Sequence, residues 1–206
     1  MKKLMYFVIL VAGISLMPSK SMAQGSYVSF GYRMAFPMAS FRDYIKTTSF
    51  RGVQFDYKYF VNDNLAVGFQ YHWNGFYENK PRQTYFFDGG AVTAEQYNFS
   101  YASNLLIGAD YYISTKNIVK PFFGFRGGMG YLELDRFVGA AQFQETVWRF
   151  SYSATAGALF QIPNTSLAFT LEGSWNQVVY DNLHYKHMSS VGLFIGFCYS
   201  GQFKDM

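Results

Sequence analysis

The sequence is poor in cysteine, in charge and in long apolar runs. Cys198 is its single cysteine, so no disulfide can form within one chain. Charged residues make up 15% of the chain. Beyond the N-terminus no apolar stretch reaches the roughly 20 residues that a membrane-spanning helix needs, and no linker rich in proline or serine divides the chain. The sequence therefore predicts one domain without membrane helices, and we expect Cys198 to be a small buried residue.

The first 23 residues have the features of a cleaved signal peptide. Lys2 and Lys3 precede the apolar run Leu4–Met17, and Ser21-Met22-Ala23 is a small-x-small cleavage site. The run is too short for a spanning helix, which disfavours the alternative of an uncleaved anchor. We place cleavage after Ala23, so that residues 24–206 form the mature domain.

Composition favours strands and gives no argument for nucleic-acid binding. The formal charge of +4 includes three lysines of the signal peptide, and the remaining basic residues nearly balance the 13 acidic ones. Aromatic residues make up 21% of the chain, and aromatic residues are enriched in β-strands.

The mature sequence alternates apolar and polar residues with a period of two. In Leu65–Trp73 the odd positions are large and apolar, while the even positions are small or polar. A helix cannot use such a stripe, because its faces repeat every 3.6 residues. Eight segments show the pattern, at about 26–36, 50–60, 65–73, 95–113, 120–131, 148–162, 167–175 and 191–199.

The connections between these segments alternate in length. Short turns follow the second, fourth and sixth segments, and long loops are expected at Pro37–Ser49, Glu78–Ala94, Asp135–Thr146 and Asp181–Met188. Short turns on one rim and long loops on the other are typical of outer-membrane barrels, whose short turns are periplasmic. We therefore expect both termini in the periplasm.

Charged residues fall on one face of the expected strands. The outward face carries none, and the inward face carries eight: Arg33, Asp56, Lys58, Asp110, Lys120, Arg126, Arg149 and Glu172. A soluble barrel such as a lipocalin would show the opposite pattern, with apolar side chains inside and polar ones in water. An Arg or Lys facing lipid at the midplane could cost about 2–4 kcal/mol. The pattern therefore predicts lipid outside and a polar lumen.

The strand pattern, the glycine and aromatic content and the segment Val191–Tyr199 resemble the eight-stranded outer-membrane barrels, namely the OmpA-type transmembrane domain and its relatives OmpX and OmpW. That segment is similar to their C-terminal assembly signal, which usually ends on an aromatic residue, although here further residues follow, including Phe203. The resemblance implies an all-β fold, an eight-stranded antiparallel transmembrane up-and-down β-barrel, in the bacterial outer membrane. It also implies contact with outer-membrane lipids and lipopolysaccharide and with the outer-membrane assembly machinery.

The narrow bore of such a barrel limits what it can do. Its interior holds side chains or one small ligand, whereas wide aqueous channels need about 16 strands. Unpaired charges would be expensive in a dry interior, and we predict that Arg126 and Glu172 take part in an ion-pair network with Arg33 and Asp56 nearby. Such a network would keep the lumen closed, with a gated conduit as the alternative.

Aromatic residues gather towards both ends of the outward face. They are predicted to form two girdles at the membrane interfaces. These are Tyr57, Tyr59, Tyr111 and Phe160 near the short turns, and Tyr71, Trp73, Tyr97, Trp148 and Trp175 near the long loops. In the loop expected at 78–94, Tyr85, Phe86 and Phe87 would either bind a carbohydrate or hydrophobic ligand or pack on neighbouring loops.

One pair of residues suggests catalysis. His187 and Ser189 lie two apart and resemble the His-x-Ser pair of the lipid A deacylase PagL, an eight-stranded outer-membrane hydrolase. A serine beside a histidine is the minimum for an activated nucleophile, with an acid to orient the imidazole. Ser190 stands where that family has asparagine, and Asp181 is the only nearby acid. We therefore expect no enzyme, with deacylation as a remote alternative.

Metal binding has equally little support in the sequence. His184 and His187 have no carboxylate or cysteine beside them that would complete a ligand set. No metal and no cofactor are expected.

Two functions without catalysis fit these features. The first is a structural or surface-interaction protein whose four long loops contact lipopolysaccharide, host molecules or neighbouring cells. The second is a narrow conduit for small hydrophobic solutes, similar to OmpW. A lumen closed by charges and aromatics would favour the first, and a continuous apolar tunnel to a lateral opening the second. We expect the first function, and we expect the protein to be a monomer.

Overall fold

The computed structural model describes residues 25–87, 89–114, 117–181 and 186–200. The expected signal peptide with its cleavage after Ala23, His184 and Phe203 lie outside these residues. The described elements are β1 (Ser26–Met38), α2 (Ala39–Tyr44), β2 (Arg51–Phe60), β3 (Leu65–Phe87), β4 (Gly90–Tyr112), β5 (Val119–Val138), β6 (Ala141–Gln161), β7 (Leu167–Val179) and β8 (His187–Tyr199). Within the described ranges, no helix is long and apolar enough to cross a membrane.

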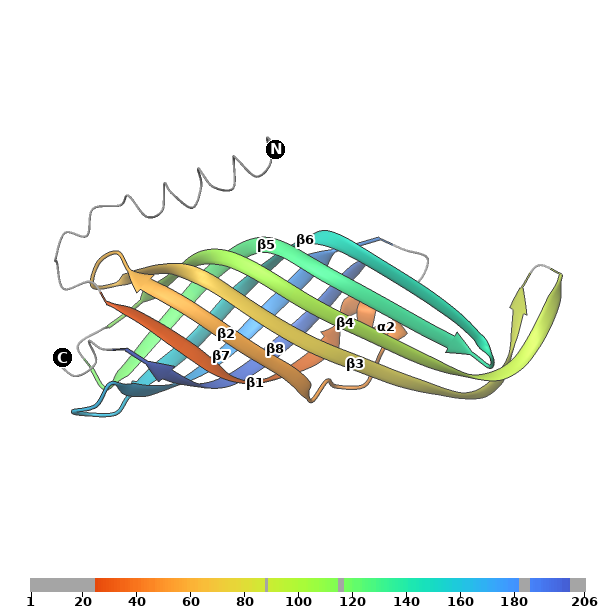
Figure 1. Ribbon diagram of the computed structural model, residues 1–206, viewed down its shortest axis with the longest axis horizontal. Coiled ribbons are helices and arrows are strands. Elements are labelled where there is room, and N and C mark those ends of the chain that lie inside the picture. The colour runs from red at the N-terminus through yellow and green to blue at the C-terminus, as the bar shows by residue number, and fades with distance from the viewer. Residues whose placement is uncertain (1–24, 88, 115–116, 182–185, 201–206) are drawn as a thin grey trace, which may run out of the picture.

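The eight strands form one closed barrel. Each strand pairs antiparallel with the next along the chain, and β8 closes the ring by pairing with β1 (Figure 1). The register runs without interruption through this closure, from Val28 opposite Tyr199 to Met38 opposite Ser189. The predicted fold class and strand number are confirmed.

The period of two builds the barrel wall. Along β2 the side chains of Gln54, Asp56 and Lys58 are buried in the lumen, while those of the alternate residues Val53 and Tyr57 are exposed outside. Because successive side chains of a strand point to opposite faces, one register sets the whole inward set. The barrel thus has polar side chains inside and apolar ones outside.

The loop expected at Glu78–Ala94 is instead a continuation of two strands. β3 and β4 pair as far as Phe87 opposite Gly90, and their hairpin projects beyond the rest of the barrel (Figure 1). The register shifts between Lys80 and Gln83, and this irregularity accommodates Pro81, which has no N–H for the ladder. The bulge thus lets the pairing continue through a segment that was expected to be a loop.

The loop expected at Asp135–Thr146 is also a paired hairpin. β5 and β6 pair up to Val138 opposite Ala141, and Gly139 adopts a positive φ of 59° in the turn. Among the described residues, β7 pairs with β6 only from Ser151 onward. The outer part of β6, residues 141–150, is therefore almost entirely exposed.

The connection from β1 to β2 turns inward rather than outward. It contains α2, and Phe41, Tyr44 and Ile45 are buried there in one apolar cluster with Phe76. The rings of Phe41 and Phe76 meet edge to face with 5.1 Å between centroids. This segment packs into the barrel mouth at the end that carries the long hairpins.

Candidate functional site: the charged lumen

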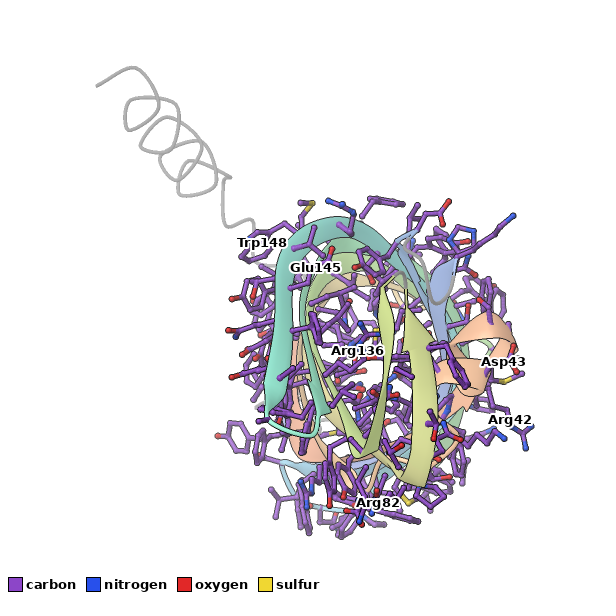
Figure 2. All side chains as sticks on the ribbon, turned by 90° about the vertical axis from the view of Figure 1, so that its right-hand side faces the viewer. Arg42, Asp43, Arg82, Arg136, Glu145 and Trp148 are labelled. Atoms are coloured by element: carbon purple, nitrogen blue, oxygen red, sulfur yellow. The ribbon has the colours of Figure 1, made fainter. Side chains whose placement is uncertain are left out.

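Charged side chains meet at mid-depth in the lumen, between two apolar clusters. Figure 2 looks along the barrel from the end with the long hairpins, with α2 and its residues Arg42 and Asp43 on one side of the ring. Glu145 and Trp148 of β6 lie on the opposite side. The group at mid-depth consists of three acidic and three basic residues, all almost fully buried: Arg33, Asp56, Lys58, Asp110, Arg126 and Glu172.

Asp110 of β4 stands at the centre of the ion pairs. One of its oxygens lies 2.6 Å from Lys58 Nζ. Arg126 donates from Nη2 to both Asp110 oxygens, at 2.8 and 2.7 Å. Glu172 of β7 approaches the same two cations at longer range, 3.9 Å from Lys58 and 3.6 Å from Arg126. Four strands thus contribute to one compact group of opposite charges.

Asp56 of β2 is held by neutral donors. Its carboxylate accepts hydrogen bonds from Ser29 Oγ at 2.9 Å, Gln54 Nε2 at 3.0 Å and Gln70 Nε2 at 2.8 Å. Both glutamines also donate to Glu172 Oε1, each at 3.2 Å. Gln54 and Gln70 therefore connect the two carboxylates that would otherwise repel each other. The sequence prediction omitted them, although their inward positions in the alternation were a usable signal.

Arg33 of β1 joins the network through neutral acceptors. Its guanidinium donates to Asn74 Oδ1 at 3.1 Å, to Ser174 Oγ at 2.8 Å and to Gln54 Oε1. Gln54 in turn donates to Asp56 and Glu172, so Arg33 reaches the carboxylates through one amide. Arg33, Asp56, Arg126 and Glu172 thus belong to one connected set in the structure.

Glycines make room for these long side chains. A Cβ on Gly192 would lie 2.2 Å from Arg33 Nη2, and one on Gly124 would lie 1.9 Å from Asp110 Oδ1. Neither distance is tolerable for non-bonded atoms, so the charged groups occupy space that only glycine leaves free. The inward glycines of the sequence are therefore part of the site.

An apolar cluster lies towards each end of the lumen. The lower cluster, at the short-turn end, consists of Tyr27, Ala66, Tyr112, Phe122, Leu159, Ala168 and Cys198. Cys198 is buried there, as expected. Lys58 Nζ lies 4.5 Å from the centroid of the Phe122 ring, which joins this cluster to the charges above. The upper cluster, at the hairpin end, includes Phe41, Tyr44 and Ile45 together with Phe76, Leu132, Val178 and Met188.

Two of the eight predicted lumen charges lie apart from this group. Lys120 is buried near the start of β5, two residues before Phe122 of the lower cluster. Arg149 is exposed, which corrects its assignment to the lumen interior. It donates to Trp148 O at 3.0 Å and lies 5.7 Å from the Tyr180 ring centroid. The alternation predicts the face of β6 on which Arg149 lies. Among the described residues, however, β7 pairs with β6 only from Ser151 onward, so nothing from β7 covers Arg149.

The aromatic residues predicted as girdles all lie on the outer surface. Tyr57, Tyr59, Tyr71, Tyr111, Trp148, Phe160 and Trp175 are exposed, while Trp73 and Tyr97 are half-buried. Several pack on aromatic neighbours, for example Trp73 stacked on Tyr101 with centroids 6.3 Å apart and Trp148 against Tyr131 at 4.9 Å. In the long hairpin Phe86 is 83% exposed, whereas the side chains of Tyr85 and Phe87 lie outside the described part.

His187 and Ser189 stand at the start of β8, opposite Val179 and Gln177. Ser189 is 5% exposed and His187 is half-buried. Among the described residues His187 Nδ1 has no hydrogen-bond partner, so no acid is bonded to that nitrogen as a triad would require. In the same part of the chain, no three side chains of His, Cys, Asp or Glu are grouped as metal ligands would be.

Comparison with known proteins rests on structure alone. Neither a protein-family model nor a curated protein matches the sequence. Among solved structures, Neisserial surface protein A (NspA) matches with 14% identity and a TM-score of 0.50, over 86% of this chain and 97% of its own. Ail, the attachment invasion locus protein of Yersinia pestis, matches with 14% identity and a TM-score of 0.50, over 87% of this chain and 99% of its own. The chain thus has the fold of the eight-stranded outer-membrane β-barrel proteins.

Proposed function

We propose that this chain is an integral protein of the bacterial outer membrane with a closed lumen, acting as a structural or surface-interaction protein through its longer rim. The observation that carries the proposal is the layered lumen. A neutral set of three acidic and three basic residues fills its middle, and an apolar cluster lies at each end. A lumen of this kind stabilises the wall and leaves interaction to the surface.

The outer face supports a membrane location. Large apolar side chains are exposed on this face, with Ile107 71%, Phe197 68% and Phe125 60% exposed. An apolar surface of this extent is unfavourable in water and favourable in lipid. The aromatic residues towards both ends would then lie at the two interfaces, beside membrane lipids and lipopolysaccharide.

The unequal rims support one orientation. Short turns join the strands at one end, whereas the hairpins β3–β4 and β5–β6 extend far beyond the other (Figure 1). In outer-membrane barrels the short turns face the periplasm, which would place both termini there. Trypsin added to intact cells should then cut the β3–β4 hairpin after Arg82, whereas Lys80 is protected by the proline that follows it. Cleavage only after permeabilisation would reverse the orientation.

The surface role follows from what the longer rim displays. Phe86 at the tip of one hairpin and Phe143 in the other are 83% and 53% exposed, outside any apolar cluster. Such residues offer contacts to lipopolysaccharide, host molecules or neighbouring cells. We propose that the barrel acts as a monomer, inserted by the outer-membrane assembly machinery.

A conduit for small hydrophobic solutes makes a distinct prediction. Cells that display the protein would take up a small apolar fluorescent dye faster than cells with an empty vector. We expect equal uptake, because the charged network interrupts any apolar route between the two clusters. Faster uptake, abolished by a mouth-blocking antibody, would overturn the closed-lumen proposal in favour of the conduit.

A further inference from the structure

Several buried polar groups of the lumen have no hydrogen-bond partner among the described residues. Four of these groups, which lie on β3, β4 and β6, are His72 Nδ1, Asn104 Oδ1, Ser151 Oγ and Ser153 Oγ. Their residues are at most 3% exposed. Buried polar groups in native proteins are nearly always satisfied, and each one left without a partner costs about 1–3 kcal/mol.

These groups line one continuous stretch of wall. His72 on β3 pairs directly with Asn104 on β4. A Cβ placed on Gly130 of β5 would lie 2.7 Å from Asn104 Oδ1, 3.2 Å from Val178 Cγ1 and 3.3 Å from Ser151 Cβ, so side chains of β4, β6 and β7 converge over this glycine. Ser153 follows on the same face of β6. We call this stretch, from His72 to Ser153, the polar chamber.

The polar chamber lies on one side of the charged network only. Below it, Ser153 is the register partner of Arg126. Above it, Leu132 follows Gly130 on the inward face of β5 and belongs to the upper cluster. On the other side of the charges the lower cluster is apolar, with Leu159 and Cys198 nearly inaccessible. The stretch of wall next to the charged network is therefore polar on its hairpin side and apolar on its short-turn side.

The chemistry of the polar chamber favours a neutral ligand with both donors and acceptors. Its orphan groups are two hydroxyls, an amide oxygen and an imidazole nitrogen. A cation would face Arg126, the register partner of Ser153, and an anion would add a negative charge beside a network in which three acidic and three basic residues already balance. Water satisfies this mixture, since a buried water usually makes about three hydrogen bonds to such groups.

We propose that the polar chamber is an internal hydration site, in which a small group of water molecules bridges His72, Asn104, Ser151 and Ser153. The hydration is one-sided: water reaches the hairpin side of the charged network, while the lower cluster stays dry. This inference goes beyond the proposed function, because a lumen can hold enclosed water without conducting. It also explains why the wall there carries small polar residues and glycines.

Transfer of magnetisation from water to side chains in solid-state NMR tests this directly. The protein in lipid bilayers would carry the substitutions His184→Gln and His187→Gln, which leave His72 as the sole histidine of the mature chain. Cys198 is the single cysteine and supplies a matched reference in the lower cluster. The rates of signal growth are compared for carbon-bound protons of the His72 ring and of Cys198 Cβ.

We expect the His72 signal to grow several-fold faster than that of Cys198. Adding Ser151→Ala and Ser153→Ala should slow it, because two of the groups that hold the water are removed. Equal slow growth at His72 and Cys198 would show a dry lumen and overturn the inference. Equal fast growth would overturn the one-sided arrangement and the dry lower cluster. Bilayer conductance measures the closed lumen separately, so either proposal can fail alone.

Discussion

Arg126 and Asp110 face each other inside the barrel, with Arg126 Nη2 donating to both oxygens of Asp110 at 2.8 and 2.7 Å. The two residues come from neighbouring strands and are at most 3% exposed. Lys58 completes the arrangement from β2, 2.6 Å from the same carboxylate. One carboxylate therefore pairs directly with two buried cations, and its removal leaves both with Glu172 alone, at 3.9 and 3.6 Å.

Replacing Asp110 with asparagine should strongly destabilise the barrel. Breaking a buried ion pair by removing one partner costs about 3–5 kcal/mol, because the remaining charge stays buried. The free energy of unfolding would be measured by urea denaturation in lipid vesicles. Asp63→Asn, in the exposed turn between β2 and β3, is the control and should change little. If both variants unfold alike, the ion pairs do not stabilise the lumen.

Gly192→Ala should also destabilise, through Arg33. The new methyl group would lie 2.2 Å from Arg33 Nη2 and 2.8 Å from Ser174 Oγ, so the guanidinium must leave its position. Overpacking of this kind costs about 1–3 kcal/mol. Gly173→Ala on β7 serves as control, since its nearest neighbour is 3.8 Å away. The same urea titration compares the two, and an unshifted Gly192→Ala midpoint would mean that Arg33 is not fixed there.

Ile107→Lys tests the lipid-facing surface. Ile107 stands outward on β4 and is 71% exposed. A lysine facing the bilayer midplane should make folding into vesicles less favourable by about 2–4 kcal/mol. Phe86→Lys, at the hairpin tip, should have almost no effect, because that position would lie in water. Equal small effects at both positions would argue against a membrane environment around β4.

Glu78→Ala should loosen the segment that fills the mouth. One oxygen of Glu78 accepts hydrogen bonds from Lys46 N at 3.1 Å, Thr47 N at 3.0 Å and Thr47 Oγ1 at 2.6 Å. Without this anchor, amide hydrogen exchange over residues 42–48 should accelerate, while exchange in the barrel strands stays unchanged. Unaltered exchange in 42–48 would show that burial of Phe41 and Ile45 alone holds the segment.

The barrel follows from the sequence because a period of two leaves few alternatives. The strict alternation in Leu65–Trp73, repeated along the chain, sets which side chains enter the lumen, and the structure places Asp110, Arg126 and Glu172 there. Strand ends were harder to predict. A loop was expected at Glu78–Ala94, yet a bulge between Lys80 and Gln83 lets β3 and β4 stay paired as far as Phe87 opposite Gly90.

Two parts of the site depend on contacts between distant strands, which periodicity does not encode. Gln54 and Gln70 link Asp56 to Glu172 only once β2, β3 and β7 are arranged around one bore. The segment with α2 that follows β1 also depends on a contact with a distant strand. Phe41 is hidden because Phe76 of β3 lies opposite, a relationship absent from the local sequence.

Single-channel recording in planar lipid bilayers tests the closed lumen most directly. Purified, folded protein would be inserted and held under voltage in concentrated potassium chloride, with an established porin as the positive control. The layered lumen predicts no discrete conductance steps above those of the bare membrane. Regular, protein-dependent steps that change in size with Asp110→Asn would contradict it, because ions would then be passing through the charged network.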